Sequence, residues 1–159
     1  RPLRDNKREQ LALWHNEFMA EVIRPNIKAS ALELVQHHQA ENAVCVIITA
    51  TNSFITQPIA NVFGIEALIA TEPELVNGEY TGKVVGLPSF REGKVSRLND
   101  WLAAKNWAMD SFESSHFYSD SINDLPLLEC VTHPVAANPD SKLTEIAQTR
   151  GWPVIELFK

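Results

Sequence analysis

The sequence predicts an α/β protein built on a mainly parallel sheet. The apolar run over residues 43–48 is short and rich in β-branched residues, which is typical of a strand buried on both faces. After this run, helical and strand patterns alternate along the chain, as they do in parallel α/β folds. The 159 residues are 45% hydrophobic and 21% charged, which suits a globular domain and excludes a disordered tail, a collagen-like array and a coiled coil.

The elements follow from periodicity and turn chemistry. A helical pattern precedes Pro25, which ends it, and a second one covers residues 26–40. Further helices are predicted over 53–63 and 94–106 and around 124–129 and 143–149, and further strands near 67–70, 116–119 and 154–157. Asn77-Gly78 predicts an antiparallel hairpin over about 74–85. We therefore expect a helical appendage over residues 1–25 and an α/β core over residues 26–159 that carries this hairpin.

The composition limits the classes of molecule to which this protein is expected to bind. Fourteen Lys and Arg against 20 Asp and Glu give a net charge of −6, which disfavours binding to nucleic acid or to an anionic membrane. No stretch approaches the roughly 18 apolar residues of a membrane helix. Two cysteines exclude a disulfide scaffold, and we expect Cys45 to be a reduced, buried thiol. These features predict a cytoplasmic protein, and they leave the oligomeric state open.

Ligands of open α/β sheets bind beyond the carboxyl ends of the strands, and the first candidate site follows the 43–48 strand. Thr49, Asn52 and Ser53 place hydroxyl and amide groups before a predicted helix, where a helix N-terminus favours anions. The alternative is a polar cap with no ligand.

The second candidate is Lys94, in the first turn of the predicted helix 94–106. A lysine there opposes the helix dipole, at a cost of about 0.3–1 kcal/mol. A bound phosphate would explain its position, and a solvated surface lysine is the alternative.

The third candidate follows the 116–119 strand. Asp120, Asn123 and Asp124 supply hard oxygen ligands and hydrogen-bond partners suited to Mg²⁺. The alternative is that both aspartates are ordinary loop and N-cap residues. The density of polar groups between two apolar segments favours a metal site.

Taken in order, Ile47-Ile48-Thr49, Gly93-Lys94 and the Asp-x-x-Asn-Asp segment over 120–124 resemble motifs two, three and four of the haloacid-dehalogenase superfamily. The phosphoserine-phosphatase-like branch, which carries a helical cap, is the most similar. The resemblance extends from the Trp14 helix onward. It implies a Rossmann-like, three-layer α/β fold, with residues 1–25 as the remnant of a helical cap.

The resemblance also implies a Mg²⁺-dependent phosphomonoesterase that works through an aspartyl-phosphate. Its substrate would be a small phosphorylated metabolite similar to phosphoserine. By this resemblance Thr49 donates to a phosphoryl oxygen and Lys94 neutralises charge, and both are catalytic. The same resemblance assigns the remaining residues: Ala50 and Asn52 to the phosphate or substrate, Asp120 to Mg²⁺, and Asn123 and Asp124 to the surroundings of the metal.

The sequence departs from the family in one respect. The family's nucleophile and its acid-base partner lie in an Asp-x-Asp motif after the first strand, and no such motif occurs in these 159 residues. We therefore expect a chain that begins inside the cap, lacks about 60–80 residues by the usual lengths of such elements, and has a gap in its sheet. A catalytically inactive phosphate-binding or scaffold protein is the alternative. A Rossmann-type cofactor binder is disfavoured because no glycine-rich first turn is present.

Overall fold

The computed structural model describes residues 29–86 and 90–156. The chain divides into two compact units, Arg1–Ser89 and Phe90–Lys159. The predicted helical appendage over residues 1–25 lies outside the described residues, so its separation from the core stays a prediction.

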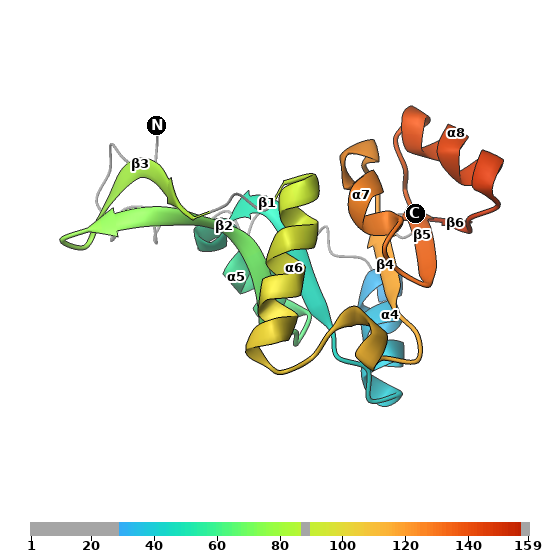
Figure 1. Cartoon of the computed structure of the whole chain (residues 1–159), viewed down its shortest axis with the longest axis horizontal. Helices are drawn as coiled ribbons and strands as arrows, with labels where there is room; N and C mark the ends of the chain where they lie inside the picture. Colours follow the sequence, from blue (N-terminus) through green and yellow to red (C-terminus); the bar gives the residue numbers. More distant parts are fainter. Residues whose placement is uncertain (1–28, 87–89, 157–159) are drawn as a thin grey trace. The chain divides into compact units, whose positions relative to one another are not determined.

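The first unit contains a β-α-β arrangement followed by a hairpin (Figure 1). Its sheet has the strand order β1-β2-β3, in which β1 and β2 are parallel and β2 and β3 are antiparallel. Asn77 and Gly78 connect β2 to β3 with φ angles of 52° and 83°. Positive φ at both turn residues matches the twist of the flanking strands, so the predicted Asn-Gly hairpin is confirmed. The described elements of this unit are α4 (Ala29–Ala40), β1 (Val46–Asn52), α5 (Ser53–Val62), β2 (Ala67–Val76) and β3 (Glu79–Val85).

The first strand differs from its prediction. It begins at Val46 rather than at residue 43, because the chain is still leaving α4: the Ala43 amide donates to the carbonyl of His38. Val44 is 48% exposed, and residues 45–48 are half-buried. Burial on both faces was therefore wrong, and Cys45 is a free, half-buried thiol rather than a fully buried one. The physical reason is that, among the described strands, β1 pairs with β2 alone.

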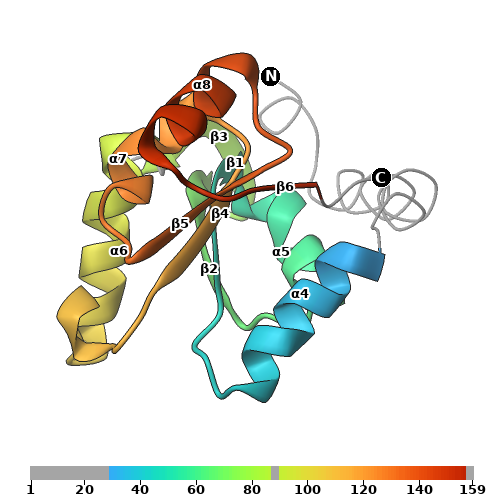
Figure 2. The ribbon, with the colours of Figure 1, turned by 90° about the vertical axis from the view of Figure 1, so that its right-hand side faces the viewer.

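The second unit has a fully parallel sheet with the strand order β4-β5-β6 (Figure 2). The strands are β4 (His116–Ser119), β5 (His133–Ala137) and β6 (Val154–Ile155). The predicted bounds of β4 are confirmed, whereas β5 was not predicted. The helices are α6 (Glu92–Ala104), α7 (Leu125–Leu128) and α8 (Ser141–Arg150), with single 3₁₀ turns η2 (Met109–Ser111) and η3 (Ile122–Asp124).

The core of this unit fixes the end of β4. Leu128, Ala136, Leu143 and Ala147 form a fully buried cluster, and Ile122 packs against it. Ile122 belongs to the segment that follows β4, so this segment is attached to the core at the carboxyl end of the sheet. Together the described strands make a mainly parallel α/β fold, as predicted, arranged as two separate sheets.

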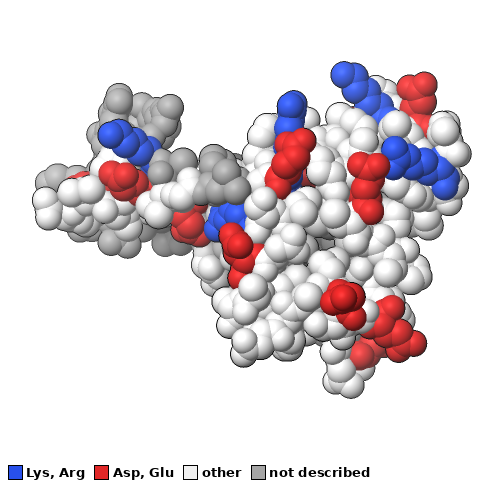
Figure 3. Space-filling view, in the orientation of Figure 1, with Lys and Arg blue, Asp and Glu red and all other residues white. Residues whose placement is uncertain are grey.

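Charges of both signs are interspersed among the described residues on the face that Figure 3 shows. None of the helices in the described ranges is long and apolar enough to cross a membrane.

Candidate functional site

The segment after β4 is built from overlapping short turns. Ser121 caps η3, because its hydroxyl accepts a hydrogen bond from the amide of Asn123 (3.1 Å). Asp124 ends η3 and lies at the N-terminal boundary of α7, where Pro126 suits the first turn of a helix. Two turns follow a four-residue strand, so the polar residues of this segment are all held at one end of the sheet.

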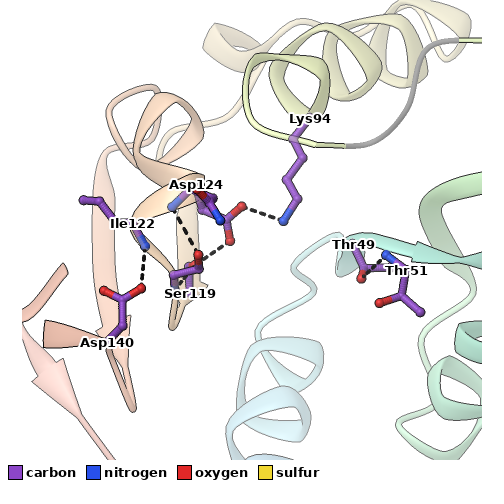
Figure 4. A network of polar contacts seen from close by, with 9 residues as sticks. Thr49, Thr51, Lys94, Ser119, Ile122, Asp124 and Asp140 are labelled. Carbon is purple, nitrogen blue, oxygen red and sulfur yellow. Dashed lines mark hydrogen bonds and ion pairs between the residues drawn. The ribbon is translucent and has the colours of Figure 1, made fainter. Parts of the chain in front are cut away.

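Asp124 is held between two side chains in a buried position (Figure 4). Nζ of Lys94 donates to Oδ1 of Asp124 at 2.5 Å, and the hydroxyl of Ser119 donates to Oδ2 at 2.5 Å. Lys94 and Asp124 are each 7% exposed, and Ser119 is 6% exposed. Hydrogen bonds to charged groups strengthen where water is excluded, so the three residues form one rigid polar cluster.

These contacts bear on the structural alternatives that the sequence left open for Lys94 and Asp124. Lys94 is buried in the first turn of α6, so it is not a solvated surface lysine. Asp124 makes no side-chain cap to α7, because its two oxygens are engaged by Lys94 and Ser119. The functional roles of both residues stay predictions.

The Lys94 ammonium retains donor capacity. It carries three N–H groups, and within the described part of the chain it makes one hydrogen bond, to Asp124. Buried donors are normally satisfied by a protein group, a water or a ligand. An anion that approached this end of the helix would find both a positive charge and free donors.

Asp120 is placed differently from Asp124. It is exposed, and its carboxylate makes no hydrogen bond or ion pair among the described residues. Mg²⁺ is usually bound through one or two carboxylates with waters and phosphate oxygens completing the shell. An unengaged carboxylate at the end of a parallel strand fits such a ligand, and half-buried Asn123 lies in the same loop.

Burial raises the pKa of the Tyr118 phenol, on β4. Tyr118 therefore stays neutral at ordinary pH and adds no negative charge near the loop.

The residues after β1 belong to the first unit. Asn52 is the N-cap of α5, and its Oδ1 accepts from the amide of Ile55 at 3.1 Å. The Thr49 hydroxyl accepts from the amide of Thr51 at 3.1 Å (Figure 4), and Ala50 is exposed. The predicted helix start is thus confirmed, while the substrate roles of Thr49, Ala50 and Asn52 stay predictions.

Ser119 was missed by the sequence analysis. Its place directly before Asp120 was a usable signal, because a hydroxyl at a strand end can reach the turn that follows. The sequence does not show that it reaches Asp124, five residues later.

A model of the haloacid dehalogenase-like hydrolase family matches residues 3–129 of the chain. The chain belongs to this family. A histidinol-phosphatase from Neisseria meningitidis serogroup C is 46% identical over 155 residues, which are 97% of this chain and 70% of that protein. Two solved structures are similar to nearly all of the chain.

The crystal structure of a protein of unknown function from Bordetella pertussis Tohama I has a TM-score of 0.96 and 55% sequence identity, over 98% of this chain and 70% of that one. A probable phosphoserine phosphatase from Vibrio cholerae has a TM-score of 0.72 at 17% identity, over 99% of this chain and 44% of that one. The second likeness concerns the fold alone. It agrees with the α/β fold of the described residues.

Proposed function

We propose that this chain forms the phosphate- and metal-binding part of a phosphomonoesterase that acts on a small phosphorylated metabolite. The observation that carries the proposal is the buried Lys94, which donates to Asp124 at 2.5 Å and makes no other hydrogen bond among the described residues. Membership of a hydrolase family supports this function. The histidinol-phosphatase relative supports a phosphorylated amino alcohol or amino acid as the substrate class.

Lys94 would bind a phosphoryl oxygen and offset its negative charge. Such stabilisation is strong in a site of low dielectric constant, because the charged donor is already in position before the reaction. Asp124 and Ser119 would keep the ammonium in place. Thr49 would donate its hydroxyl to the phosphoryl group, and Ala50 and Asn52 would border the substrate.

The donor set of the β4 loop fits Mg²⁺. Asp120 would supply the carboxylate ligand, while Asn123 and Asp124 would hold the waters and side chains around it. When bound, the ion would supply charge neutralisation at the phosphate. The nucleophilic aspartate that the family resemblance implies has no counterpart in the 159 residues, so the complete reaction needs a residue from outside them.

The test uses the protein expressed from the full reading frame that encodes this chain. Phosphate release is measured from an aryl phosphate, from phosphoserine and from histidinol phosphate, with Mg²⁺ and with a chelator. We expect Mg²⁺-dependent release that falls at least about a hundredfold in Lys94→Ala and in Asp120→Ala, the size seen when one charge-stabilising donor is removed. Arg150→Gln, which removes an exposed ion pair with Glu129, serves as the control and should retain activity.

Activity that survives Lys94→Ala and Asp120→Ala would contradict the site assignment. The absence of phosphate release from all three compounds would contradict the function. A reading frame without an Asp-x-Asp segment would favour the alternative, an inactive phosphate-binding or scaffold protein. An in-frame Asp-x-Asp segment would remove that alternative.

A further inference from the structure

Asp140 contacts the β4 loop as well as its own helix. One carboxylate oxygen accepts from the amide of Leu143 at 2.7 Å, which is the ordinary N-cap of α8. The other oxygen accepts from the amide of Ile122 at 3.0 Å (Figure 4), 18 residues earlier in the chain. The Asp140 amide also donates to the carbonyl of Asp120 at 2.8 Å. An N-cap needs the first of these three contacts and neither of the others.

The two additional contacts hold the backbone directly after Asp120. The carbonyl of Asp120 and the amide of Ile122 belong to the two peptide groups on either side of Ser121, and both are bonded to the same residue. They fix the orientation of the backbone that leaves Asp120. The Asp120 side chain has no contact of its own among the described residues, so its direction depends on this backbone.

We propose that Asp140 is a positioning residue, which orients the Asp120 carboxylate through the backbone of residues 120–122. The inference rests on the proposed function, in which Asp120 is the metal ligand. Asp140 is exposed, so its hydrogen bonds compete with water and each contributes only modestly to stability. Groups that orient a metal ligand in this way commonly change metal affinity or activity about 10- to 100-fold when they are removed.

A pair of variants separates the two roles of Asp140. Asp140→Ser keeps a good N-cap for α8, but its side chain is too short to reach Ile122 as well. Asp140→Ala removes both side-chain contacts, and the backbone bond from the Asp140 amide to the Asp120 carbonyl remains in either variant. Arg150→Gln is the control, because it removes an ion pair between Arg150 of α8 and Glu129 (2.9 Å) without touching the loop.

Three measurements are made on the protein from the full reading frame. We expect Asp140→Ser to raise the Mg²⁺ concentration for half-maximal phosphatase activity about tenfold and to reduce the Mg²⁺-induced rise in Tm. Its Tm without Mg²⁺ should stay close to that of the wild type, whereas Asp140→Ala should lower it by about 2–4 °C. Hydrogen exchange should speed up at the Ile122 amide in both variants, and at the Leu143 amide in Asp140→Ala alone.

A merely structural N-cap predicts a different pattern: wild-type Mg²⁺ dependence in Asp140→Ser, with changes confined to Asp140→Ala. That result would overturn the positioning role and leave the proposed function intact. An equal shift of Mg²⁺ dependence in Arg150→Gln would also overturn it, because the effect would then belong to α8 as a whole. A wild-type protein that neither hydrolyses phosphate esters nor responds to Mg²⁺ would overturn the proposed function, and the inference with it.

Discussion

Removing one partner of the buried Lys94–Asp124 pair should destabilise the protein far more than removing both. At the observed 2.5 Å, two unit charges in a medium of effective dielectric constant about 20 attract each other by about 7 kcal/mol. The desolvation of two ions, which costs several kcal/mol for each, offsets most of this attraction. The pair as a whole therefore adds little net stability, but either charge left alone has no compensation.

We expect Lys94→Met and Asp124→Asn each to lower the free energy of unfolding by about 3–5 kcal/mol, the usual cost of an unpaired buried charge. For a chain of this length that corresponds to a fall in Tm of about 6–20 °C. The double variant should lose less than either single variant, because neither charge remains and the introduced asparagine side chain can still accept from Ser119.

Urea unfolding followed by tryptophan fluorescence measures this cycle, since Trp101 lies on the same helix as Lys94. The matched control is Arg150→Gln, which breaks an ion pair whose side chains are 39% and 48% exposed and should cost less than about 1 kcal/mol. The reasoning would be refuted if the single variants unfolded like the control, or if their costs were simply additive.

Three further predictions follow from single residues. Asp120→Asn should leave the free energy of unfolding within about 0.5 kcal/mol, because its carboxylate has no protein contact among the described residues, yet it should weaken Mg²⁺-induced stabilisation in a thermal melt. Burial raises the pKa of Cys45 above its ordinary 9.0, so iodoacetamide should label Cys45 more slowly than exposed Cys130 at pH 8. Because the thiol ionises at a lower pH in the unfolded chain, the stability that Cys45 contributes below pH 9.0 should be lost as the pH rises through the pKa of the folded state. Asn52→Ala should lower the free energy of unfolding in urea by about 1 kcal/mol, and Asn52→Asp should hardly change it, since aspartate is also a good N-cap. Equal losses in the two variants would contradict a stabilising role of the hydrogen bond between Asn52 and the Ile55 amide.

Local signals predicted the elements with strong patterns. The bounds of β4 and the hairpin turn were correct because a short aromatic pair and an Asn-Gly pair are signals that act over a few residues. Strand β5 was missed because its sequence, His-Pro-Val-Ala-Ala, contains a proline and one β-branched residue. It forms because β4 and β6 pair with it on both sides, and that environment is absent from its own sequence.

The candidate site was predicted as a set of residues, not as a set of contacts. Motif order placed Lys94 and Asp124 in one site, but their ion pair joins residues 30 positions apart and depends on how α6 packs beside the β4 loop. Ser119 was missed because its contact also depends on the folded structure. Its hydroxyl gains a role only when the turn after β4 brings Asp124 back to it.

Three aspartates in the second unit differ in their hydrogen-bond partners, and these partners determine what each carboxylate can do. Asp124 forms an ion pair with Lys94 and accepts a hydrogen bond from Ser119, so each of its oxygens already has a protein partner. Asp140 accepts from two backbone amides, which hold the loop. Asp120 has no such partner among the described residues and is exposed. A carboxylate with unengaged oxygens can bind a cation without first breaking a protein contact, and of these three aspartates Asp120 alone meets that condition.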